Sequence, residues 1–169
     1  MRAFFGLPLP PAASDALDAW RTHNLPPFLK PVPMQNFHIT LAFLGDISPQ
    51  TQRKLVNAIG KIEHQKVEMM LDKTGYWPKQ GIYFATASRE SPQLNSLATR
   101  AKSLAGKAGV RTPKGLYLPH VTLARQCDDA PVALSHPEIQ IEFPEFCLFE
   151  STRTPKGVRY DAIENFALN

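Results

Sequence analysis

Two short segments of the chain alternate apolar and polar residues in the same way. In residues 36–44 one face is formed by Phe37, Ile39, Leu41 and Phe43. The other face carries His38 and Thr40, followed by Ala42. In residues 118–125, Val121 and Leu123 lie opposite His120 and Thr122. Because side chains alternate faces along a strand, we expect two strands, each with an apolar face and a His-Thr face.

The rest of the pattern predicts further strands and three helices. Apolar runs predict strands at residues 2–7, 67–71, 81–87, 139–143, 146–152 and 158–163. Apolar residues at helical spacing predict a helix after the prolines at 8–11, a second from Pro49 to near Glu63, and a third from Pro92 to Gly109. Residues 25–33 contain four prolines and are expected to form a connecting loop. Strands mixed with helices, without strict alternation, indicate an α+β protein.

The length and composition of the chain suit one globular unit. A chain of 169 residues is about one domain long, and we expect that domain to span residues 1–169. No segment approaches the roughly 20 apolar residues that a membrane-spanning helix needs. Prolines soon interrupt the apolar N-terminal run, so it does not resemble a signal peptide. We therefore expect a cytoplasmic monomer without a membrane partner.

The two cysteines and the net charge carry less information. Cys127 and Cys147 lack the spacing of a zinc site, so two reduced, partly buried thiols are expected, although a disulfide stays open. A net charge of +4 favours an anionic partner but is common among ordinary proteins. Lys114 and Lys156 each lie in a Pro-Lys-Gly turn, and such turns are usually solvated. Together with Arg111, Arg153 and Arg159, the same lysines could instead bind an RNA backbone that leads into a cleft.

The duplicated pattern, His38-Ile-Thr40-Leu-Ala and His120-Val-Thr122-Leu-Ala, predicts the chemistry. Two such strands facing one another would surround a small ligand with two imidazoles and two hydroxyls. One histidine can remove a proton from water while the other donates a proton to a leaving oxygen. The hydroxyls of Thr40 and Thr122 can donate hydrogen bonds to phosphate oxygens. This chemistry needs neither a metal nor a cofactor, and no metal-binding motif is present.

These two motifs, with Phe4-Phe5-Gly6-Leu7-Pro8 and the run from His38 to Gly45, resemble the 2H phosphoesterase superfamily. More narrowly, the chain resembles the RNA 2′,3′-cyclic phosphodiesterases, formerly called 2′-5′ RNA ligases. The resemblance implies a bilobal fold with two pseudo-symmetric lobes of antiparallel sheet and helices around a central cleft. It also implies that His38 donates a proton to the 3′ oxygen and that His120 is the proton acceptor, a division that the residues alone leave open.

Arg125 follows the second motif, and its position raises a structural question. In the family that the chain resembles, the matching arginine contacts the phosphate. An ideal strand would point Arg125 away from Thr122, so a β-bulge or the end of the strand would have to redirect it. The first motif has Phe43 at the matching position, so the two halves of the expected site differ chemically.

The sequence leaves four functions open. The resemblance favours hydrolysis of a terminal 2′,3′-cyclic phosphate on RNA to a 2′-phosphomonoester. The same acid and base could run the reverse reaction, which would make a 2′-5′ RNA ligase. The site could also hydrolyse a small cyclic nucleotide, or capture RNA ends without catalysis. Trp77, beside a turn, is the best candidate for stacking on a nucleobase, although core packing is the commoner role of an aromatic residue.

Overall fold

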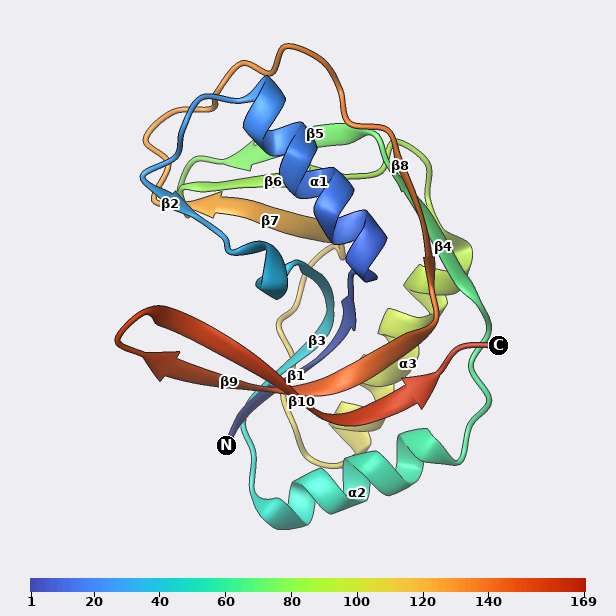
Figure 1. Ribbon diagram of the computed structural model, residues 1–169. Helices are drawn as coiled ribbons and strands as arrows, with labels where there is room; N and C mark the ends of the chain where they lie inside the picture. The colour runs from blue at the N-terminus through green and yellow to red at the C-terminus, as the bar shows by residue number, and fades with distance from the viewer.

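The computed structural model describes residues 1–169 and contains ten strands and three α-helices, whose arrangement can be followed in Figure 1. The helices are α1 Pro11–Asn24, α2 Pro49–Gly60 and α3 Pro92–Lys107. The strands of the first half are β1 Arg2–Pro8, β2 Lys30–Pro31, β3 His38–Asp46, β4 Val67–Leu71, β5 Lys73–Trp77 and β6 Ile82–Thr86. Those of the second half are β7 His120–Arg125, β8 Ile139–Phe143, β9 Glu145–Thr154 and β10 Gly157–Ala167. No helix is both long and apolar enough to cross a membrane.

Two four-stranded sheets form two lobes, and each lobe holds one His-Thr strand. One sheet has the order β10-β9-β1-β3, the other has the order β2-β7-β6-β5, and β4 pairs separately with β8. All strand pairs are antiparallel. Strands β9-β1-β3 correspond to β5-β6-β7, with the motif strand at the same place in both. The predicted α+β fold and its bilobal arrangement are confirmed.

The buried side chains of both motif strands contribute to one continuous core. Ile39 and Leu41 of β3, and Val121 and Leu123 of β7, belong to the same cluster of 33 buried residues. A shared core fixes the two strands relative to one another, because moving either strand disturbs packing on the other.

Helices α2 and α3 begin at Pro49 and Pro92, as the sequence predicts. The side chains of Ser48 and Ser91 accept hydrogen bonds from the backbone N–H groups of Thr51 and Leu94, as expected of N-caps followed by proline. Helix α2 ends at Gly60, earlier than the predicted end near Glu63. Cys127 and Cys147 are free, so the structure contains no disulfide.

Two strands were absent from the sequence-based prediction. Strand β5 pairs along its whole length with β6, and strand β2 pairs Lys30 with Arg125 and Pro31 with Ala124. The interpretation of residues 25–33 as loop alone is therefore wrong at Lys30–Pro31. Proline lacks an N–H group but keeps its carbonyl, and it is tolerated on an edge strand such as β2.

Candidate active site

The two motif histidines are held by the same local hydrogen bond. Nδ1 of His38 lies 2.7 Å from the carbonyl oxygen of Asn36, and Nδ1 of His120 lies 2.9 Å from that of Leu118. A carbonyl only accepts, so in each case Nδ1 carries the proton and donates it. In the neutral ring this leaves the lone pair on Nε2. Each histidine therefore presents Nε2 for proton transfer.

The motif threonines accompany the histidines as their spacing predicts. Oγ1 of Thr40 lies 3.1 Å from Nε2 of His38, so the two groups are hydrogen-bonded on one face of β3. Thr122 and His120 are two residues apart on β7, and both are half-buried. Between them, Val121 is fully buried on the other face. A polar face over an apolar anchor is thus present in both lobes.

A β-bulge directly follows the His-Thr pair of each motif and determines where the next side chains point. Between β1 and β3, Gly6 pairs with Thr40 but Phe5 pairs with Ala42, so Leu41 is the extra residue. Between β6 and β7, Phe84 pairs with Thr122 but Tyr83 pairs with Ala124, so Leu123 is the extra residue. One extra residue reverses the alternation of faces beyond it.

Because of the bulges, the residues that follow them lie on the opposite face from the one predicted, and Arg125 lies with the histidines. After the bulge in β7, Arg125 shares the face of His120, and its charge acts on both His38 and His120. After the bulge in β3, Ala42 is buried, whereas Phe43 is 42% exposed. The prediction that placed Phe43 with Ile39 and Leu41 is therefore wrong. Phe43 and Arg125 occupy matching positions in the two lobes.

Arg21 stabilises the bulge in β7, and sequence reasoning missed it. The carbonyl oxygen of Leu123 accepts hydrogen bonds from Nη1 of Arg21 at 2.7 Å and from the backbone N–H of Val32 at 2.9 Å. Nη1 of Arg21 also donates to the carbonyl of Val32. A single arginine in the amphipathic helix α1 gives no sign of this role, because its partners are backbone atoms more than ten residues away.

Aromatic rings pack against both histidines. The ring of His38 lies 4.9 Å from that of Phe4 and 4.9 Å from that of Tyr160, centroid to centroid. The ring of His120 lies 4.6 Å from Trp77 and 5.4 Å from Phe84. These rings limit the positions that each imidazole can adopt. The suggestion that Trp77 stacks on a base stays a prediction, but Trp77 does lie beside a motif histidine.

Two glycines make room for these aromatic rings. A Cβ on Gly6 would lie 3.0 Å from Cε2 of Phe4, and a Cβ on Gly75 would lie 2.6 Å from Cε2 of Phe84. A Cβ atom essentially never lies closer than 3.0 Å to such a neighbour, so a side chain at position 75 would displace the ring of Phe84. Gly75 therefore allows Phe84 to lie across β5 and to support His120. The sequence contains this glycine inside a strand, where close approach of another group is a common reason for it.

Tyr117 joins the segment before the second motif to the first motif strand. Its hydroxyl donates a hydrogen bond of 2.6 Å to the carbonyl oxygen of Thr40. Nζ of Lys102 lies 4.7 Å from the centre of the Tyr117 ring. Burial raises the pKa of Tyr117 well above its usual range, so the hydroxyl keeps its proton as a donor. This hydrogen bond holds the segment just before His120 against β3, the strand that carries His38.

Burial is the main cause of a lowered pKa at both motif histidines. It lowers the pKa of His38 from 6.5 to about 4; the Asn36 carbonyl opposes the change, and the charges of His120 and Arg125 add to it. Burial also lowers the pKa of His120, with Leu118 and Arg125 acting in the same opposing directions. Both rings are therefore ready to accept a proton at Nε2, and either needs a nearby anion to hold one.

The shift at His38 predicts a pH-dependent stability. The unfolded chain takes up the proton near pH 6.5 and the folded protein only near pH 4, so stability is full above pH 6.5 and decreases as the pH falls toward 4. We expect the free energy of unfolding in urea to fall over this range by up to about 3 kcal/mol more in the parent than in His38→Gln. Parallel curves for the two proteins would contradict the assigned shift.

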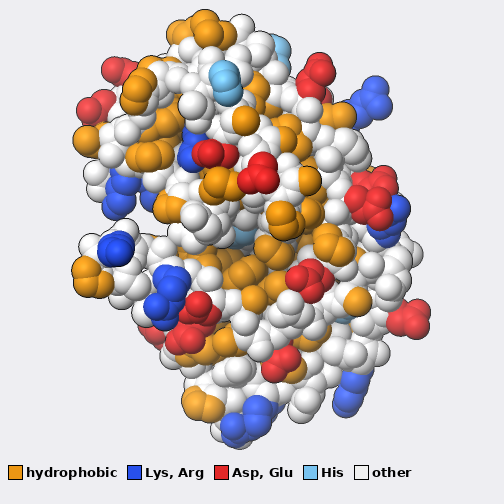
Figure 2. All heavy atoms as spheres, in the orientation of Figure 1, with side chains coloured by type: hydrophobic (Ala, Val, Ile, Leu, Met, Phe, Trp, Pro, Cys, Tyr) orange, Lys and Arg blue, Asp and Glu red, His pale blue; other side chains and the backbone are white.

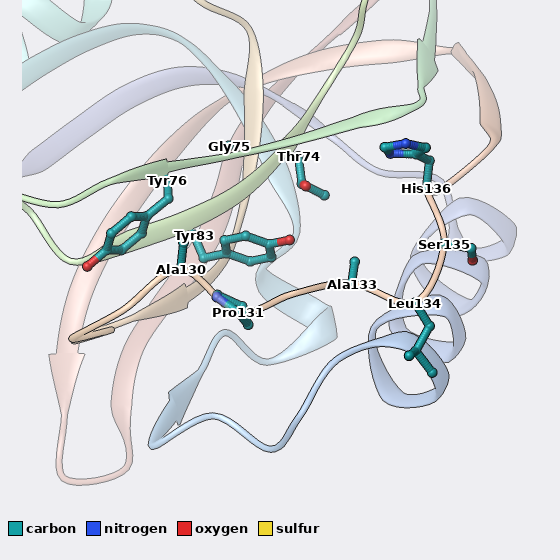
Figure 3. A pocket seen from close by; sticks show the side chains of 10 residues that line it. All are labelled: Thr74, Gly75, Tyr76, Tyr83, Ala130, Pro131, Ala133, Leu134, Ser135 and His136. Atoms are coloured by element: carbon teal, nitrogen blue, oxygen red, sulfur yellow. The ribbon is translucent and has the colours of Figure 1, made fainter.

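Two recesses are lined by residues outside the two motifs. The loop residues Arg111, Thr112, Pro113 and Lys114 line one of about 590 Å³. Figure 3 shows another, of about 410 Å³, between strands β5 and β6 and residues 130–136. Neither is lined by a motif residue. Figure 2 shows the motif cleft as the hollow between the two lobes, with histidine visible inside it. No group of three or more His, Cys, Asp or Glu side chains is arranged to hold a metal ion.

The chain was also compared with known proteins. A family model described as LigT like phosphoesterase matches residues 7–83 and 86–160. An RNA 2′,3′-cyclic phosphodiesterase of Escherichia coli is 29% identical over 99% of this chain and 96% of its own length. The protein of the same name from Thermus thermophilus is 33% identical, over 99% and 90%. The structure of E. coli LigT complexed with 3′-AMP superposes with a TM-score of 0.91 and 29% identity, covering 99% of this chain and 97% of LigT.

Proposed function

Because this chain belongs to the LigT-like phosphoesterase family, we propose that it is an RNA 2′,3′-cyclic phosphodiesterase that leaves a 2′-phosphomonoester. Its curated relatives from E. coli and Thermus thermophilus carry that name over nearly the whole chain. The observation that supports the proposal most is the matched pair of histidines. Each is tied through Nδ1 to a carbonyl, which leaves Nε2 for proton transfer, and Nε2 of His38 lies beside Thr40.

The proposed reaction uses the two histidines in opposite roles. His120, neutral in the free protein, accepts a proton from water, and the water oxygen attacks phosphorus. The bond between phosphorus and the 3′ oxygen breaks, and His38 donates a proton to that oxygen. The phosphate remains on the 2′ oxygen. Both histidines are regenerated when the proton taken by His120 is lost and His38 takes one up.

The remaining polar groups of the site bind the phosphate in this proposal. The hydroxyls of Thr40 and Thr122 donate to its non-bridging oxygens, and the Arg125 guanidinium balances the charge that grows in the transition state. A bound phosphate anion also offsets the effect of Arg125 on the two imidazoles. This raises the pKa of both, so that His38 can hold the proton that it donates.

An assay with a defined RNA end tests this function. We expect an oligonucleotide with a 2′,3′-cyclic phosphate to be converted, in the presence of EDTA, into a 2′-phosphomonoester alone, as followed by ³¹P NMR. Added 5′-hydroxyl RNA would reveal ligation as a longer product. Binding without any product would indicate a non-catalytic module. A 3′-phosphomonoester product, or complete loss of activity in EDTA, would contradict the proposed reaction.

A further inference from the structure

Lys30 and Arg125 place two positive charges opposite each other beside the cleft. They are direct partners in the ladder between β2 and β7, and partners in an antiparallel pair share a face. Like charges in this arrangement are destabilising. None of the four ion pairs in the protein involves either residue. A lysine on an edge strand discourages pairing with another chain, but that role does not require it to face an arginine.

The hairpin of β9 and β10 carries a third unpaired cation on the same side. Arg153 pairs with Val158, and Ser151 pairs with Tyr160, whose ring packs against His38. Since residues two apart share a face, Arg153 lies on the face that Tyr160 turns toward the cleft. Arg159 lies on the opposite face, where Nε contacts Asp161 at 2.9 Å. Arg153 forms no ion pair.

The hairpin and β2 lie at the same end of the cleft. Both extend toward the left of Figure 1, and Figure 2 shows Lys and Arg side chains on both rims of the hollow at that end. The side-chain amide of Asn36 donates to the carbonyl oxygen of Val158 at 3.0 Å, which ties the hairpin to the segment before β3. The opening between β2 and the hairpin, which we call the basic mouth, is thus lined by Lys30 and Arg153.

We propose that the basic mouth binds the phosphodiester backbone of the RNA strand on the 5′ side of the cyclic end. This inference rests on the proposed function and gives its site a preference for oligonucleotides over cyclic mononucleotides. Strand β2 lies one strand spacing, about 4.8 Å, outside β7. Lys30 on β2 is therefore farther from the strand of His120 than Arg125, which lies on that strand. Arg125 serves the reacting phosphate, and Lys30 and Arg153 serve the phosphates that follow it.

Two substrates that differ only in length test this proposal. We would measure kcat/KM for 2′,3′-cyclic AMP and for a five-residue oligoadenylate with a 2′,3′-cyclic phosphate end. In Lys30→Gln and in Arg153→Gln, the ratio of oligonucleotide to mononucleotide kcat/KM should fall about tenfold, the loss expected for one charge-assisted contact. The slope of log(kcat/KM) against log[salt] for the oligonucleotide should decrease by about 0.7 per substitution. Arg159→Gln, on the other face of the same hairpin, is the matched control and should leave the ratio unchanged.

The outcomes separate the two proposals. If the parent hydrolyses neither substrate, the proposed function fails. If it hydrolyses both, and Lys30→Gln and Arg153→Gln keep the parental ratio, the function stands and the basic mouth does not bind RNA. An equal loss on both substrates would also overturn the inference, because the residues would then act on the cyclic phosphate or on the fold.

Discussion

Replacing His120 with alanine is expected to lower kcat/KM on a cyclic-phosphate RNA end by about 10²- to 10⁴-fold, and replacing His38 by a similar factor. In the proposed reaction, His120 takes the proton from the attacking water and His38 gives a proton to the leaving 3′ oxygen. Neither lies in the hydrophobic core, so both variants should fold, and circular dichroism should match the parent. His23→Ala is the matched control, since His23 is exposed on α1 and bonds only to the carbonyl of Ala19.

The roles of the two histidines can be separated with a modified leaving group. A substrate in which sulfur replaces the bridging 3′ oxygen needs no general acid, because a thiolate leaves without protonation. We expect this substrate to restore most of the rate of His38→Ala and little of the rate of His120→Ala. Restoration of His120→Ala instead would reverse the proposed roles. Full activity of either variant on the natural substrate would remove that histidine from the mechanism.

Gly75→Ala is expected to lower kcat/KM by about 10²-fold, although Gly75 contacts no substrate in the proposed reaction. The added Cβ would lie 2.6 Å from Cε2 of Phe84, so the ring must move. Phe84 packs against both Trp77 and His120, with ring centroids 4.2 and 5.4 Å away. A displaced Phe84 therefore misplaces the proposed base. The free energy of unfolding should also fall, by about 1–3 kcal/mol, because the strand is overpacked.

Two further variants make this prediction specific. Gly106→Ala, in α3, meets no atom within 4 Å and should leave both activity and stability close to the parent. Adding Phe84→Leu to Gly75→Ala removes the end of the ring and should recover part of the lost stability, measured as a double-mutant cycle in urea. Unchanged activity in Gly75→Ala, or additive effects in the cycle, would show that the Phe84 ring does not transmit the substitution.

The sequence predicted what depends on local patterns. His38 with Thr40, and His120 with Thr122, were expected to share a strand face because the side-chain period of a strand is two. The helix starts at Pro49 and Pro92 were predictable because proline suits the first turn of a helix. The two related lobes were expected from the phosphoesterase superfamily that the duplicated motif resembles.

The sequence could not predict features that depend on distant partners. Strand β5 contains Gly75 and lacks a regular alternation, and only its pairing with β6 makes it a strand. The bulges at Leu41 and Leu123 are invisible in the alternation itself, which continues through both residues. They appear only in the register with β1 and β6. For the same reason, the sequence alone did not determine which face of the strand Arg125 occupies.

The difference between Phe43 and Arg125 has a consequence for regiochemistry. A cleft with true twofold symmetry would accept the cyclic phosphate equally well in two orientations, which exchange the 2′ and 3′ oxygens between the histidines. Half of the bound substrate would then face the wrong acid, and two isomeric products would result. Because an arginine stands on one side and a phenylalanine on the other, the two orientations differ in energy, and a difference of 1.4 kcal/mol already favours one by tenfold. The bulge at Leu123 supplies this bias, because it brings Arg125 to the face of the histidines.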